Sequence, residues 1–304
     1  MARTIKLKGD RSATPRWWDM AQTDPNAWKL DVQFSGKGDT RRVLLLADLH
    51  WDNAHCRLDL LQATLDEAKR IGAPVFSFGD HFCAMQGKWD KRASADALRD
   101  EHRGGNYLDL LVQTCADWFQ PYRDNLAMIS LGNHETAIRR HHQVDLTQQL
   151  VGLLRREGSP VVAGPYWGFV VIQGRFLDGA SKSDTIKLHF SHGFGGGGPI
   201  TRGLIDHSRT RSDYDCDVHV SGHIHRRNCD ENVITRVTSL GKVYQQSQLY
   251  LRCSTWKDES RDGYHVEKGR AGRPIGGWWL DLTALKHRDV RNNNYSLKVT
   301  AVPT

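Results

Sequence analysis

The chain has 304 residues, of which 39% are hydrophobic and 25% charged, and its formal net charge at pH 7 is +7. This composition is typical of a soluble globular protein and argues against disorder along the whole chain, while the longest apolar runs fall far short of the roughly 20 residues that cross a bilayer. The basic N-terminus lacks the apolar core of a secretory signal, so we expect a cytoplasmic protein without membrane contact. Its positive charge favours anionic partners.

The first half of the sequence predicts alternating strands and helices. Residues 1–28 show no clear period and are expected to form an irregular arm, followed by a hairpin of residues 30–34 and 42–47. Apolar residues recur every three to four positions over 58–71, which predicts an amphipathic helix that ends at Gly72. Further strands are expected at 75–78 and 127–131, and further helices at 107–119 and 145–156. This alternation predicts a parallel sheet covered by helices.

Strand-like runs predominate in the second half of the sequence. They cover residues 168–172, 186–191, 218–221, 248–252, 278–282 and 296–302. We expect these runs to form a second sheet stacked on the first. Because no internal repeat or long low-complexity tract interrupts the chain, we expect one α/β domain over residues 41–304, preceded by an arm and a hairpin strand over 1–40.

Polar residues of metal-binding types follow five of the expected strands. The motifs are Asp48-Leu49-His50, Gly79-Asp80, Gly132-Asn133-His134-Glu135, His192-Gly193 and Gly222-His223-Ile224-His225. Sites in open α/β sheets collect at the carboxyl ends of strands, so we expect these side chains to converge. The glycines permit sharp turns and close approach to an ion. Carboxylate and amide oxygens together with imidazole nitrogens suit Mn, Fe, Zn or Ni, which predicts a metal site.

In this order, the five motifs resemble those of the calcineurin-like metallophosphoesterase superfamily, which read D-x-H, G-D, G-N-H-[ED], H and G-H-x-H. The resemblance covers Val43 to His225 and implies the metallophosphoesterase fold, a four-layer α-β-β-α sandwich of two mixed sheets. It also implies two divalent metal ions, with Mn favoured and Fe, Zn, Ni or Mg as alternatives. By matched position, one ion is held by Asp48, His50 and His225, the other by Asn133, His192 and His223, and Asp80 bridges them.

The resemblance further implies hydrolysis of phosphoesters, in which a metal-bridging hydroxide is the nucleophile and His134 protonates the leaving oxygen or stabilises developing charge. We expect phosphodiesters of nucleic acid, DNA or RNA, or of nucleotides, because the chain is basic and contains 10 tryptophans. Phosphomonoesters and phosphoproteins are the alternative substrates. A non-catalytic scaffold or nucleic-acid-binding protein is the alternative class, and the presence of His134 argues against it.

Several residues outside the ligand set carry weaker expectations. Many relatives read G-D-x-x-D, whereas this chain has Cys83 in place of the second acid, and we expect Cys83 to serve packing. Three arginines are candidate substrate contacts: Arg139, Arg140 and Arg202. Residues 80–90 are similar to stretches of uncharacterised phage and bacterial members, which suggests a viral origin. The remaining histidines near the motifs are interpreted as structural: His55, His81, His189, His207 and His219.

Overall fold

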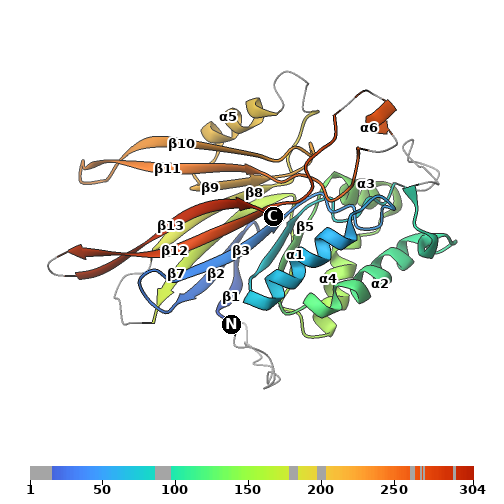
Figure 1. Cartoon of the computed structure of the whole chain (residues 1–304), viewed down its shortest axis with the longest axis horizontal. Coiled ribbons are helices and arrows are strands. Elements are labelled where there is room, and N and C mark those ends of the chain that lie inside the picture. The colour runs from blue at the N-terminus through green and yellow to red at the C-terminus, as the bar shows by residue number, and fades with distance from the viewer. Residues whose placement is uncertain are drawn as a thin grey trace.

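In a computed structural model of the chain, two mixed β-sheets lie face to face, with helices on the outside (Figure 1). The structure describes residues 16–85, 97–177, 184–196, 203–260, 264–267, 269, 271–289 and 292–304. Within these ranges, every helix is too short or too polar to cross a membrane.

The first sheet has six strands in the order β13-β12-β3-β4-β5-β6. Their bounds are β3 Thr40–Leu46, β4 Val75–Phe78, β5 Leu126–Ser130, β6 Val162–Gly164, β12 Trp278–Asp289 and β13 Asn292–Pro303. Strands β3 to β6 run parallel, and β12 and β13 join antiparallel on the side of β3. The predicted parallel sheet of the first half is therefore confirmed.

Four helices cover the outer face of this sheet (Figure 1). They are α1 Leu58–Ile71, α2 Tyr107–Phe119, α3 Asn133–His142 and α4 Leu146–Arg156. Helix α1 buries Leu61, Leu65 and Ala68, the apolar stripe of its sequence, and ends at Gly72, whose φ of 69° suits glycine. Asp145 begins α4 by accepting a hydrogen bond from the Gln148 backbone N–H at 2.9 Å. The described residues also contain three short helices: η2 Asp100–His102, η3 Gln120–Tyr122 and α6 Tyr264–Glu267.

The second sheet has seven strands in the order β1-β2-β7-β8-β9-β11-β10. Their bounds are β1 Trp18–Asp24, β2 Ala27–Phe34, β7 Trp167–Phe176, β8 Thr185–Ser191, β9 Val218–Ser221, β10 Asn228–Val237 and β11 Val243–Arg252. Helix α5 (Leu204–Asp213) lies on the outer face, where the His207 ring is 5.9 Å from Tyr250 and 6.5 Å from His219.

Strand β3 shows how the two faces of a sheet divide the core. Val43, Leu45 and Ala47 belong to the cluster between the sheets, whereas Leu44 and Leu46 belong to the cluster under the helices. This alternation follows from the two-residue period of a strand. Helices α1 to α4 form one outer layer, the two sheets form the two inner layers, and α5 forms the other outer layer. The predicted α-β-β-α sandwich is therefore confirmed.

Two expectations for the N-terminal region are wrong. Residues 18–24 are not an irregular arm but form β1, which pairs antiparallel with β2. Trp18 and Trp28 anchor these strands because their side chains are buried between the sheets. Strands β2 and β3 do not pair as a hairpin either, since β2 pairs with β7 in one sheet and β3 with β4 in the other. The turn near residues 36–39 crosses between the sheets.

Candidate metal centre

The predicted ligand residues directly follow the carboxyl ends of five strands. Asp48 and His50 follow β3, Asp80 follows β4, Asn133 begins α3 after β5, His192 follows β8, and His223 and His225 follow β9. Five of them, Asp48, His50, Asp80, His223 and His225, have left-handed backbone with φ between 45° and 73°. This conformation costs a non-glycine residue about 1–3 kcal/mol and is concentrated at functional sites. Its sharp bends bring neighbouring polar side chains into one site.

Asp48, His50 and His225 form the first group of possible ligands. The Nε2 atoms of the two histidines are 3.1 Å apart, and Asp48 Oδ1 is 3.4 Å from His225 Nε2. All three residues are largely shielded from solvent. They are also the three residues that the motif resemblance assigns to one ion, so the structure brings this predicted set together.

Asp80, His192 and His223 form the second group. His192 Nε2 is 3.1 Å from Asp80 Oδ2 and 3.0 Å from Asn133 Oδ1, and the same amide oxygen is 2.7 Å from His223 Nδ1. His192 Nδ1 donates a hydrogen bond to the Phe78 carbonyl, so Nε2 is the nitrogen that faces the oxygens. The predicted ligands of the second ion therefore also lie together.

The two groups adjoin and have the chemistry of a divalent metal site. Asp48 Oδ1 of the first group is 4.0 Å from His192 Nε2 of the second. This oxygen is buried and has no hydrogen-bond partner among the described residues, although a buried carboxylate oxygen is costly without one. Carboxylate oxygens, an amide oxygen and imidazole nitrogens are ligands of first-row divalent ions. The residues present therefore fit divalent metal ions.

His134 lies beside the two groups and is held by three contacts. Its backbone N–H donates to Asp80 Oδ1 at 3.0 Å, and its Nδ1 donates to the Cys83 carbonyl oxygen. Its Nε2 is 3.6 Å from Asp80 Oδ2. Because Nδ1 is engaged with a carbonyl oxygen, Nε2 is the nitrogen that faces the centre and can exchange a proton there.

Two of the motif glycines leave room for the ligand side chains. A Cβ atom at Gly132 would collide with the Asp80 backbone nitrogen and carboxylate, and a Cβ at Gly222 would collide with the Asp48 carboxylate. Alanine at either position would therefore displace a predicted ligand. Glycine is needed at both positions because a carboxylate occupies the space in which a Cβ atom would lie.

The sequence analysis assigned no role to three carboxylates that support the centre, although Glu135 belongs to one of the motifs. Both oxygens of Glu135 accept backbone hydrogen bonds, from Asp80 and Gly132 at 3.1 and 2.8 Å and from Phe82 at 2.9 Å. These bonds fix the loops after β4 and β5. The Asp52 carboxylate likewise accepts hydrogen bonds from the backbone N–H groups of residues 83 and 84, at 2.5 and 2.9 Å. Glu259 is the third, and it was missed because it lies in a loop with no motif.

Glu259 is buried and accepts a hydrogen bond from His225 Nδ1 at 3.0 Å. The loop that carries it is fixed to the centre, since the Trp256 backbone N–H donates to the Asp48 carbonyl at 3.0 Å and Ser254 Oγ donates to the His225 carbonyl at 2.9 Å. A carboxylate on the far nitrogen of a ligating histidine orients the ring and makes it a stronger ligand.

We therefore expect Glu259→Gln to weaken metal binding at the His225 position by about 10- to 100-fold. The amide retains the size of the side chain, so the fold should persist. Titration of the purified variant with Mn²⁺, followed by calorimetry, measures the change, and Glu267→Gln on α6 is the control. An unchanged affinity would show that Glu259 does not orient His225.

The remaining predicted residues lie outside the ligand groups. Arg139 and Arg140 are exposed on α3, where Arg139 pairs with Asp145 at 3.5 Å, and their substrate role stays a prediction. Arg202 and residues 86–90 lie outside the described residues.

Four of the histidines that were interpreted as structural contact one another or other buried side chains. His189 Nδ1 is 2.8 Å from His219 Nδ1, and the His207 ring on α5 lies next to His219. His81 contacts Ser77 and Cys115. These contacts agree with structural roles for the four histidines.

Two predicted ligands bind protons tightly. Burial lowers the pKa of His192, but the neighbouring Asp80 and Asp48 outweigh burial and raise it to about 9. Burial also lowers the pKa of His225, and Asp48 and Glu259 outweigh it and raise the pKa to about 10. Both rings are therefore protonated at pH 7, and an arriving metal ion must displace these protons because only neutral imidazole coordinates.

We expect metal binding at pH 7 to release about two protons per chain, and the affinity to rise with pH up to the raised pKa values near 9 and 10. The sign follows from proton competition, which weakens as the pH approaches those values. Calorimetric titration with Mn²⁺ in buffers of different ionisation enthalpy counts the protons. If metal binding released no protons, the rings of His192 and His225 would already be neutral before the metal binds.

No protein-family model matches this sequence, and no curated protein matches it significantly. Among solved structures, it is similar to a predicted phosphoesterase from Streptococcus pneumoniae, with 10% identity, a TM-score of 0.29, and coverage of 88% of this chain and 99% of that one. A metallophosphoesterase from Sphaerobacter thermophilus has 14% identity, a TM-score of 0.32, and coverage of 84% and 88%. Vps29 from Entamoeba histolytica, solved with zinc, has 11% identity, a TM-score of 0.30, and coverage of 86% and 98%.

At these identities and TM-scores, the neighbours carry no argument about the activity of this chain. Fold and function rest on its own topology and on the side chains that converge at the ends of its strands.

Proposed function

We propose that the chain is a metal-dependent phosphoesterase with two divalent ions, and that phosphodiesters of nucleic acids or nucleotides are its substrates. The convergence of two ligand groups beside His134 carries this proposal. Asp48, His50 and His225 would hold one ion, and His192, His223 and Asn133 the other, with Asp80 shared between them.

When bound, divalent ions at this centre would neutralise phosphate charge and lower the pKa of a water molecule. The chain's own residues supply positioning and proton transfer. His134 Nε2 faces the centre because Nδ1 is bonded to the Cys83 carbonyl, so the protonated ring can give a proton to the leaving oxygen. Glu135 keeps Asp80 in place through the Asp80 backbone.

The surface near the centre favours an anionic substrate longer than a single phosphate. Helix α3 begins at Asn133 and carries exposed Arg139 and Arg140 in its last turn, about one and a half turns from His134. Cations at this distance suit contacts to neighbouring phosphates of a nucleic acid. The net charge of +7 favours the same class of substrate.

A substrate panel tests the proposal. It contains p-nitrophenyl phosphate, its bis ester, cyclic nucleotides, and single- and double-stranded DNA and RNA, each with Mn²⁺, Ni²⁺, Zn²⁺ or Mg²⁺. We expect hydrolysis of the bis ester and of at least one nucleic acid or nucleotide, faster than that of p-nitrophenyl phosphate. Preference for the monoester would identify a phosphomonoesterase instead.

A non-catalytic scaffold or nucleic-acid-binding protein is the second candidate. The well-formed ligand groups and His134 argue against it, because binding alone requires neither. Less than one metal ion per chain, together with no hydrolysis of any substrate in the panel, would favour this second candidate.

A further inference from the structure

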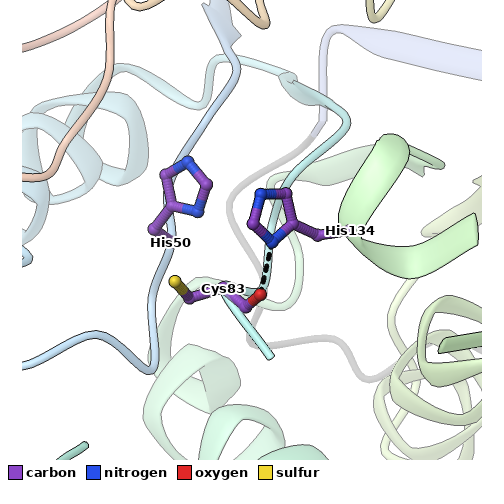
Figure 2. A group of neighbouring side chains, drawn as sticks. All are labelled: His50, Cys83 and His134. Atoms are coloured by element: carbon purple, nitrogen blue, oxygen red, sulfur yellow. Dashed lines mark hydrogen bonds between the residues drawn. The ribbon is translucent and has the colours of Figure 1, made fainter. Parts of the chain in front are cut away.

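His50, Cys83 and His134 form a third group of possible metal ligands, which shares His50 with the first group and adds Cys83 and His134. One ligand atom from each residue lies within 4.8 Å of the others. Figure 2 shows the two imidazole rings side by side with the Cys83 side chain next to them, and the ring centroids are 5.0 Å apart. It is the group that contains a thiol.

The orphaned Nδ1 of His50 is a second, independent observation. His50 is 2% exposed, and its Nδ1 has no hydrogen-bond partner among the described residues. Its Nε2 is the atom that lies 3.1 Å from His225 Nε2 in the first group. The other side of the same ring therefore remains available for a ligand.

The third group is held firmly. Cys83 Sγ accepts a hydrogen bond from Asn53 Nδ2 at 3.3 Å, and the Cys83 backbone N–H is bonded to Asp52. His134 is tied to the Cys83 carbonyl. Because Zn–S and Zn–N bonds are about 2.3 and 2.0–2.1 Å long, a bound ion would bring the three ligand atoms about 3.5 Å apart. The three ligand atoms lie within 4.8 Å of one another, so each pair would have to approach by at most about 1.3 Å.

We propose that Cys83, His50 and His134 form an additional site for a thiophilic divalent ion, such as Zn²⁺ or Cd²⁺, and that an ion bound there inhibits the enzyme. The imidazole of His134 would coordinate the ion, so this ring could no longer transfer a proton. The inhibition rests on the proposed function, whereas the binding of the ion does not.

The thiol makes this site selective among metals. Burial raises the pKa of Cys83 to about 12, so the sulfur holds its proton at neutral pH. Binding forms an S–metal bond, and the thiol proton passes to solvent, as does the ring proton of His50 when both of its nitrogens coordinate. Soft thiolate ligands favour Zn²⁺ or Cd²⁺, whereas Mn²⁺ and Mg²⁺ prefer oxygen. Inhibition should therefore appear with Zn²⁺ or Cd²⁺ added to Mn²⁺-loaded protein.

Titration of the Mn²⁺-loaded chain with Cd²⁺ tests the site without any substrate. We expect the ultraviolet thiolate-to-cadmium charge-transfer band to reach one thiolate per chain, and to be lost in Cys83→Ser. Serine keeps the backbone carbonyl that binds His134 and the acceptor for Asn53. The matched control is Cys229→Ser, which removes an exposed thiol and should leave the band unchanged.

Hydrolysis of the bis ester in excess Mn²⁺ tests the consequence. Zn²⁺ should inhibit the wild type at a concentration at least tenfold below that needed for Cys83→Ser, each measured relative to the activity of that same protein without Zn²⁺. A band that persists in Cys83→Ser, or no band in the wild type, overturns the site. A Cys83-dependent band with equal inhibition of both proteins overturns the inhibitory role. If the wild type proves inactive, the proposed function fails and the band still tests the site.

Discussion

Replacing His134 by alanine is expected to lower kcat by about 10²- to 10⁴-fold, the usual contribution of a general acid. The ring lies beside the ligand groups, with Nε2 3.6 Å from Asp80 Oδ2, and it belongs to neither of the two groups assigned to the catalytic ions. Its loss should therefore remove proton transfer and leave both ions bound. Metal analysis after dialysis and steady-state kinetics on the bis ester measure the two quantities separately.

The matched control is His141→Ala, which removes an exposed histidine from the same helix α3 and should change kcat less than about twofold. A substrate with a better leaving group should also rescue His134→Ala in part, because such a group needs less protonation. Loss of an ion from His134→Ala would place His134 among the ligands and contradict its role as a general acid.

Elements with a strong local signal could be predicted from sequence. The helix at residues 58–71 has the predicted bounds because its apolar period and Gly72 specify both the buried face and the end. The ligand motifs could be found because each follows a short apolar strand. Strand β1 could not be predicted, since only Trp18 among its seven residues is buried and its sequence shows no alternation of apolar and polar residues. The tertiary pairing with β2 determines its conformation.

The parts of the centre that sequence could not reveal depend on contacts between distant segments. Glu259 reaches His225 from a loop 34 residues later, and no local pattern distinguishes it from other acids. Cys83 was expected to serve packing, and its side chain is buried, yet the fold also places it beside two histidines. Only the juxtaposition of the loops after β3, β4 and β5 indicates that this thiol has metal-binding neighbours.

Asp80→Asn should have the largest effect, because Asp80 is expected to bind both ions. The asparagine oxygen can still accept the hydrogen bond from the His134 backbone N–H, now at 3.0 Å, so the fold should persist. The lost negative charge should weaken both ions together. We expect activity to fall by about 10³-fold or more, which corresponds to about 4 kcal/mol of transition-state stabilisation.

Asp48→Asn is the comparison that makes this result specific. Asp48 lies in the first group with His50 and His225, so its neutralisation should release mainly one ion, whereas Asp80→Asn should release two. Metal content after dialysis against Mn²⁺ at fixed concentrations gives both affinities. The alternative is that Asp48 is the bridging ligand of the two ions, since its Oδ1 lies 3.4 Å from His225 Nε2 and 4.0 Å from His192 Nε2. Loss of one ion from Asp80→Asn and of two from Asp48→Asn would assign the bridging role to Asp48.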